Sequence, residues 1–174
     1  MGGPFPLSPK QGKNMTTKQW TISIYLLLVS MTLGAVLTLG IFVTATIFHS
    51  DSYLVGTLLN HYNEGVLMAE IFRRFSYFIS FMALVVFIFE ANEYKHGRRD
   101  NWVMISAFFV ISSAMMFSAI YTPKILAMQA LGAEATQSAA FTALHMGSEI
   151  DFKVLALALG ILFIRRMRLM FVQK

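Results

Sequence analysis

Three of the four histidines lie where they could bind a metal ion or a haem group. His49 ends one long apolar stretch, His145 begins another, and His61 lies between apolar stretches with Glu64 three residues further on. Two histidines at similar depth on neighbouring membrane helices can ligate a b-type haem, and a histidine with a carboxylate can contribute to a metal site. The sequence contains no CxxCH, HExxH or HxxxH motif. We therefore favour each histidine as a capping or interfacial polar group, with haem and metal binding as the alternatives.

Acidic and basic residues beside two of the apolar stretches form a second candidate site. Arg73 and Arg74 precede the apolar run 75–89, and Glu149 and Asp151 begin the last apolar stretch. Because ionisable groups near a membrane span are costly, they tend to pair or to line a wet cavity. We expect Arg73 or Arg74 to pair with Glu149. The favoured role is an interhelical clamp at the headgroup level, and the alternative is a polar vestibule that admits a solute or a proton from outside.

The composition limits the classes of protein that could use these residues. Of 174 residues, 56% are hydrophobic and 13% are charged, and the mean hydropathy is +0.61, whereas a soluble domain has roughly 45–50% apolar and about 25% charged residues. This excludes a disordered tail, a nucleic-acid-binding arm and most cytosolic enzymes. The absence of cysteine excludes disulfides, thiolate metal sites and iron–sulfur clusters. We interpret the twelve methionines as packing residues rather than as Cu(I) ligands.

Four apolar stretches are long enough to position these candidates on membrane-spanning helices. A bilayer core about 30 Å thick needs about 20 apolar residues in a helix. The sequence predicts an all-α polytopic membrane protein whose transmembrane helices cover about 20–48, 71–93, 102–121 and 140–166. These helices form one up-down bundle, predicted over 20–168. The flanking segments are a flexible cytoplasmic leader, 1–19, and a cytoplasmic tail, 169–174.

The distribution of cations predicts the orientation of these helices. Ten of the fourteen Lys and Arg residues lie before the first stretch, between the second and third, or after the fourth: Lys10, Lys13, Lys18, Lys95, Arg98, Arg99, Arg165, Arg166, Arg168 and Lys174. With four spans these segments share one side, which the positive-inside rule makes cytoplasmic. We expect both termini inside, in a bacterial inner (cytoplasmic) membrane. The net charge of +5 then serves topology and anionic-lipid contact rather than nucleic-acid binding.

Small residues on the first and last predicted helices indicate where these helices pack. At about 100° per residue, Gly34, Thr38 and Ala45 share one face of the first helix. Ala156 and Gly160 share one face of the last helix. Because small residues let helix backbones approach closely in lipid, we expect the two helices to pack along these stripes. This packing would bring the histidines at their outer ends to a similar depth.

Four landmarks of the sequence resemble one family in their order and spacing. They are GAVLTLGIFVTATIF (34–48), EIFRRFSYF (70–78), YTPKI (121–125) and FTALHMGSEID (141–151). Over about residues 22–165 the chain is similar to the transmembrane protein 205-like family, found in bacteria as a four-helix integral-membrane domain of unknown function. The resemblance implies a four-helix membrane fold and no established chemistry.

The sequence favours a small membrane protein without a catalytic site over two other classes of function. The favoured class is an accessory subunit, or a protein that handles a small solute or a metal ion, with a polar site at the outer face. The alternative is an electron-transfer subunit that binds haem b with His49 and His145 as axial ligands. A membrane enzyme is least favoured because no catalytic constellation is evident. Expected partners are the lipid bilayer and a second copy or a larger membrane complex, but no nucleic acid.

Overall fold

The computed structural model describes residues 16–54 and 59–172, and this part of the chain is all-α. Its helices are α1 (Thr17–Leu37), the π-helical η1 (Thr38–Val43), α2 (Thr44–Phe48), the 3-10 helix η2 (Ser50–Ser52), α3 (His61–Lys95), α4 (Asn101–Met116), the π-helical η3 (Phe117–Tyr121), α5 (Thr122–Ala130), α6 (Ala133–Thr136) and α7 (Ala139–Val172). Most of the predicted leader, 1–15, and the last two residues of the predicted tail lie outside the described residues.

Polar side chains outside the apolar runs set where the helices begin. Thr16 and Gln19 form a capping box at the start of α1, with the Thr16 amide donating to Gln19 Oε1 over 2.8 Å. The Asn60 side chain accepts from the Asn63 amide at the start of α3, and Asp100 accepts from the Val103 amide at the start of α4. As a result α3 begins at His61, ten residues before the start predicted from its apolar run.

Two stretches of π-helix interrupt otherwise continuous helices. The segments α1, η1 and α2 form one helix over Thr17–Phe48, and α4, η3 and α5 form another over Asn101–Ala130. In the first, the Thr44 hydroxyl donates to the Leu39 carbonyl over 2.8 Å, a side-chain bond that accompanies the wider turn. In the second, η3 ends two residues before Pro123, which has no amide hydrogen to donate. Such π segments are frequent at functional sites.

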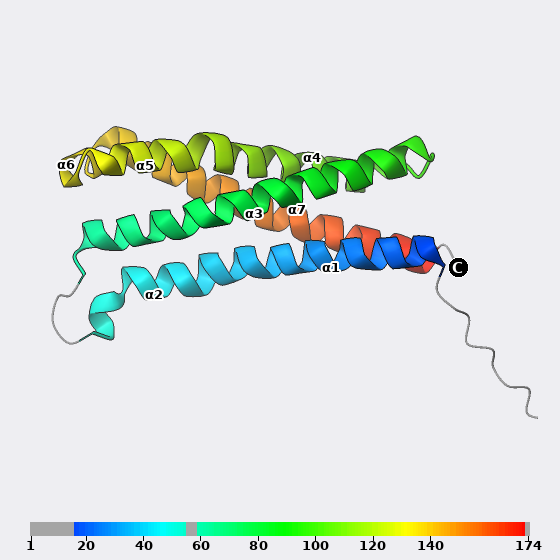
Figure 1. The fold of residues 1–174 in the computed structure, drawn as a ribbon, viewed down its shortest axis with the longest axis horizontal. Coiled ribbons are helices and arrows are strands. Elements are labelled where there is room, and N and C mark those ends of the chain that lie inside the picture. The colour runs from blue at the N-terminus through cyan, green and yellow to red at the C-terminus, as the bar shows by residue number, and fades with distance from the viewer. Residues whose placement is uncertain (1–15, 55–58, 173–174) are drawn as a thin grey trace, which may run out of the picture.

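The long helices lie side by side and alternate in direction, with α7 crossing the others obliquely (Figure 1). The C-terminal half of α7 lies beside α1, and its N-terminal half lies beside η3 and α5 (Figure 1). The same view shows both described ends of the chain at one end of the molecule. We call this end the terminal end and the opposite end the loop end.

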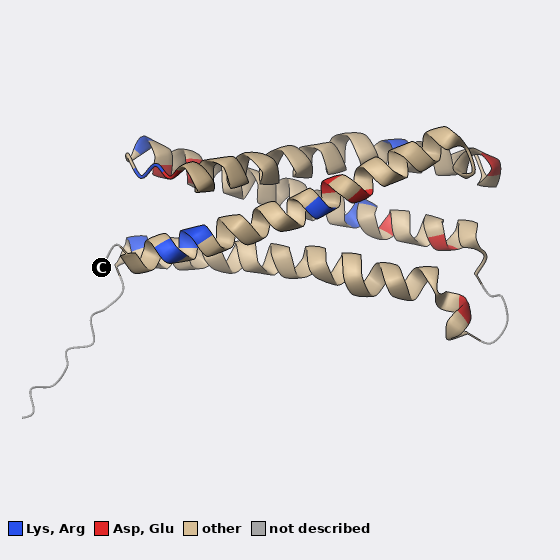
Figure 2. Cartoon of the chain, turned by 180° about the vertical axis from the view of Figure 1, so that it is seen from behind, with Lys and Arg blue, Asp and Glu red and all other residues tan. Residues whose placement is uncertain are grey.

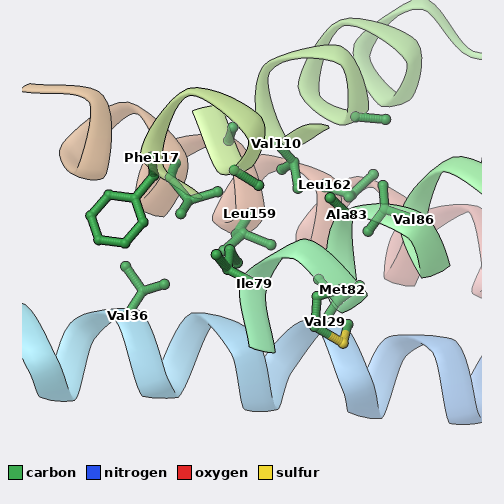
Figure 3. Packing of buried hydrophobic residues seen from close by; sticks show 14 of the residues in the cluster. Val29, Val36, Ile79, Met82, Ala83, Val86, Val110, Phe117, Leu159 and Leu162 are labelled. Carbon is green, nitrogen blue, oxygen red and sulfur yellow. The ribbon is translucent and has the colours of Figure 1, made fainter. Parts of the chain in front are cut away.

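The core lies where α1, α3, α4 and α7 approach one another, in the half of the molecule nearer the terminal end. Figure 3 shows Val29 of α1, Met82 of α3 and Leu162 of α7 directed into this core. These side chains are at most 1% exposed. In lipid the hydrophobic effect does not drive these helices together, because the acyl chains are as apolar as the side chains. Van der Waals contact in the closely packed core holds them together instead.

Three helices are long and apolar enough to cross a membrane: Thr17–Phe48, His61–Lys95 and Asn101–Ala130. Large apolar side chains are exposed along all three, including Met31, Phe81 and Phe108. The fourth long helix, α7, carries charged residues at both ends of its apolar run 154–164. Figure 2 shows charged residues at the terminal end and again further along α7, with an uncharged stretch between them.

The stripe of small residues predicted on the first helix is wrong as a contact surface. Gly34, Thr38 and Ala45 lie on the exposed side of this helix, and a Cβ at Gly34 would meet no atom within 4 Å. The side that packs is formed by larger residues, including Tyr25, Val29 and Val36, because these fill the space between obliquely crossing helices. On α7, Ala156 packs against the core, whereas a Cβ at Gly160 would also meet no atom within 4 Å.

Candidate functional site: an apolar cavity at the loop end

An apolar cavity of about 720 Å³ lies between the helices in the loop-end half of the molecule. Its walls come from α1, η1 and α2 on one side, from α3, and from η3, α5, α6 and α7 on the other. Ligand pockets for small molecules have volumes of about 300–1,000 Å³ and are mostly apolar with a few polar groups. The cavity therefore has the size and the lining of a ligand site.

The oblique path of α7 creates this cavity. Where α7 lies against α1 the side chains form the core, but towards the loop end α7 moves onto η3 and α5 while α2 stays on α3 (Figure 1). The helices that enclose the core therefore diverge in this half. Both π-helical segments lie at the divergence, and Gly40 and Ile41 of η1 and Phe117 and Tyr121 of η3 line the cavity.

Aromatic side chains form the floor of the cavity. Phe72 of α3, Phe117 of η3 and Phe152 of α7 contact one another with ring centroids 5.5 Å apart. Gly40 of η1 lies against this cluster, since a Cβ there would be 3.4 Å from the Phe152 ring. A side chain at position 40 would thus occupy the space between η1 and α7.

The exposed titratable side chains of the lining define what we call the mouth of the cavity: His61, His145, Glu149 and Lys153. The Tyr62 hydroxyl donates to the Gln129 carbonyl over 2.8 Å and ties α3 to α5. Lys153 donates to Glu149 over 2.7 Å, and both line the cavity from exposed positions on α7. Because these two charges neutralise each other, the mouth has no excess charge from this pair.

Two of the three candidate histidines line the cavity. His61 lies 3.4 Å from Glu64 and is mostly exposed, and His145 stacks on Phe141 with ring centroids 6.1 Å apart. His49 is exposed, and its Nδ1 lies 2.8 Å from the Ala45 carbonyl of its own helix, away from the cavity lining. Among the described residues there is no group of three or more His, Asp and Glu side chains that could hold a metal ion. The proposed haem pair, His49 and His145, therefore does not face a common space.

The arginines predicted to pair with Glu149 pair within their own helix. Arg73 Nε donates to Glu70 over 2.6 Å and Arg74 Nε donates to the same carboxylate over 2.8 Å. Glu149 pairs with Lys153, one turn further along α7. The predicted interhelical clamp is wrong, because partners three and four residues apart on one helix are already in reach.

Asp151 lies apart from the other members of the predicted polar site. It faces the contact between α7 and α4, where the Ser113 hydroxyl is its neighbour. Its Oδ2 atom is buried without a hydrogen-bond partner among the described residues. Neither Asp151 nor the two arginines line the cavity, so only Glu149 of the predicted polar site does.

A buried ionic cluster at the terminal end was not predicted as such. Arg166 of α7 donates from Nε to Glu90 over 2.9 Å, and its Nη2 bonds the other oxygen of that carboxylate. Glu90 also accepts from the Tyr25 hydroxyl over 2.8 Å. Glu93, one turn along α3, pairs with Arg98 and also lies 3.5 Å from Arg166. The cluster joins α1, α3 and α7 through groups that are almost fully buried.

A second ion pair at the terminal end joins α7 to the start of α4. Arg165 of α7 donates from Nη2 to Asp100 over 2.8 Å and from Nε over 3.1 Å. The hydrogen bond from Arg165 holds the pKa of Asp100 below its usual range, and the amide of Val103 contributes in the same direction. Since Asp100 also caps α4, the pair fixes the start of α4 to the end of α7.

The described residues form an all-α protein with three helices that are long and apolar enough to cross a membrane and with an apolar cavity between its helices. A family model described as Domain of unknown function (DUF4149) matches residues 27–134, and the chain belongs to this family. The match runs from the middle of α1 to the start of α6, whereas the α7 residues of the cavity lie outside it. Comparisons with curated proteins and with solved structures give no match. The resemblance to the transmembrane protein 205-like family stays a prediction.

Proposed function

We propose that this protein crosses the membrane four times and holds the apolar chain of an amphipathic molecule in its loop-end cavity. The fourth crossing is α7, whose C-terminal half lies beside α1 and which also packs on α4. A bilayer that encloses the other three long helices must also enclose the middle of α7. Its apolar run from Val154 to Ile164 is about 16 Å long. Lys153 and Arg165 can extend their side chains from the ends of this run towards the headgroups.

The orientation follows from the cations at the terminal end. This end carries Arg98, Arg99, Arg165, Arg166 and Arg168. By the positive-inside rule the terminal end faces the cytoplasm and the cavity lies towards the outer face of the membrane, in the bacterial inner membrane in our proposal. The molecule in the cavity then comes from the outer leaflet or from the outer aqueous phase.

The observation that carries the proposed function is the apolar lining with a polar mouth. The phenylalanine floor offers a long chain only van der Waals contact, whereas His61, His145 and the paired charges of α7 stand at the mouth. A molecule with an apolar chain and a neutral or zwitterionic head matches both parts. A metal ion or a small polar solute matches only the mouth.

The wall between η1 and α7 offers a route from the bilayer. Ile41 of η1 is 57% exposed yet lines the cavity, as does the exposed Lys153 of α7. A chain could pass beside Ile41 and the methylene groups of Lys153. We therefore expect the ligand to be a lipid or a lipid-like molecule that enters sideways.

Photo-crosslinking to a lipid tests this function. The purified protein is reconstituted in phosphatidylcholine vesicles that contain a phosphatidylcholine with a diazirine near the end of one acyl chain. We expect adducts on residues that line the cavity, such as Met68 and Phe72, in addition to adducts on the exposed apolar residues of the long helices. Adducts on those exposed residues alone would refute the proposal.

A matched pair of variants on α7 controls for general lipid contact. Ala156→Phe adds a ring to a residue that lines the cavity, whereas Leu157→Phe adds one to a neighbour that is 69% exposed. We expect Ala156→Phe to reduce the cavity adducts several-fold and Leu157→Phe to leave them unchanged. Equal loss in both variants would contradict a ligand in the cavity.

A further inference from the structure

A small groove at the terminal end combines apolar and cationic side chains on one helix face. The groove, of about 270 Å³, is lined by Trp102 of α4 and by Ile161, Ile164, Arg165 and Arg168 of α7. The α7 residues are spaced three, four and seven positions from Ile161, which places them on one face. The groove is remote from the cavity and shares none of its lining residues.

The order of these residues along α7 follows the order of groups in a lipid. Ile161 and Ile164 lie towards the middle of the helix. Arg165 follows Ile161 by four residues and Arg168 follows Ile164 by four, so each arginine lies about one turn, or about 5.4 Å, nearer the end of the helix. The side chain of Trp102 is 60% exposed at the same end, as is usual for tryptophan at the headgroup level. Acyl chains could therefore lie on the isoleucines while a head group meets the arginines.

The charges of the groove favour one negative charge. Arg165 is bonded to Asp100 through Nε and Nη2, which neutralises its charge and leaves Nη1 for another acceptor. Arg168 is exposed and forms no ion pair with the other described residues. The groove and Asp100 thus carry one net positive charge, which a phosphodiester would balance.

We propose that this groove binds an anionic phospholipid of the leaflet at the terminal end, with its phosphate on Arg168 and on the free edge of Arg165. Basic pockets between transmembrane helices are a recognised way to bind anionic head groups. Here the Trp102 ring, the two isoleucines and Arg168, which has no ion-pair partner among the described residues, line one groove. The proposed ligand differs from that of the cavity in its charge and its leaflet.

The two tryptophans of the chain allow a direct test. Trp20→Phe leaves Trp102 as the only tryptophan, so its fluorescence reports on the groove alone. This protein is placed in phosphatidylcholine vesicles that contain an equal minor fraction of either dibrominated phosphatidylglycerol or dibrominated phosphatidylcholine. Bromine quenches tryptophan on contact, and we expect stronger quenching by the anionic lipid.

Charge variants separate a specific site from general attraction. Arg168→Gln is expected to lower the preference for phosphatidylglycerol about fivefold, the fold-change that corresponds to about 1 kcal/mol for one cation near anionic lipid. Arg99→Gln removes a cation from the same end that does not line the groove, and it should leave the preference unchanged. Equal quenching by both lipids in the parent, or equal losses in the two variants, would overturn the proposal.

Discussion

Removal of Arg166 should destabilise the protein more than removal of any exposed cation. Arg166 is 7% exposed and supplies two hydrogen bonds to Glu90 and one longer contact to Glu93. In Arg166→Leu the Glu90 carboxylate keeps only the Tyr25 hydroxyl among the partners described above. A buried charge that loses its partner costs about 3–5 kcal/mol, and we expect a loss in this range.

The free energy of unfolding in mixed micelles, followed by circular dichroism as SDS is added, measures this loss. Lys153→Gln is the control, because it breaks the exposed pair with Glu149 and should cost only about 0–1 kcal/mol. The double variant Glu90→Leu with Arg166→Leu removes both buried charges. It should lose less than the sum of the single variants by about 1–3 kcal/mol, because each single variant leaves a charge unpaired. The reasoning is refuted if Arg166→Leu costs no more than Lys153→Gln, or if the two losses simply add.

Three further outcomes are expected. Arg165 lowers the pKa of Asp100 in the folded protein below the ordinary aspartate value of about 3.9. The pair should therefore stabilise the fold at pH values above about 3.9, and this contribution should be lost as the pH falls through the lowered pKa. Asp100→Asn, which keeps the cap, should flatten that part of the stability profile measured between neutral and acidic pH. Gly147→Ala places a Cβ 3.2 Å from the Tyr121 ring and should lower stability by about 1–3 kcal/mol, whereas Ala143→Gly, one turn away and exposed, should cost about 1 kcal/mol or less. Single cysteines at Ser8, Gly97 and Gln173 should resist a membrane-impermeant thiol reagent in intact cells while one at Asn60 reacts, and labelling at Gly97 from outside would reverse the proposed orientation.

The helical nature of the chain could be predicted because lipid leaves the backbone little choice. A spanning segment must satisfy its amides and carbonyls internally, so long apolar runs indicate helices. The extensions of these helices were harder to predict because they depend on polar residues. Asn60 with Glu64 in the first turn was the available signal for the early start of α3.

The ion pairs show what a single sequence can and cannot specify. Glu70 stands three and four residues before Arg73 and Arg74, so their local pairing could have been predicted from helical spacing. The partners of Arg166 could not, since Glu90 is 76 positions away and only the packing of α7 on α3 and α1 brings them together. In the sequence Arg166 stands between Arg165 and Arg168, so nothing in its spacing distinguishes it from the exposed cations of the same end.

The cavity could not be predicted from the sequence. It depends on the oblique path of α7 and on the two π-helical turns, which no periodicity of apolar residues reveals. His145 and Glu149 were identified as candidates from the sequence. That they line a cavity follows only from the structure, which places η1, α2 and α3 opposite α7. The phenylalanines of the floor were ordinary apolar residues in the sequence.

Native mass spectrometry of the detergent-purified protein tests the central claim most directly. The mass of the intact protein shows whether it retains a single amphipathic molecule when the detergent is removed in the gas phase. We expect one bound molecule on the parent protein and on Leu157→Phe, and none on Ala156→Phe, whose added ring occupies the cavity. Equal retention by all three proteins would contradict a ligand held in the cavity.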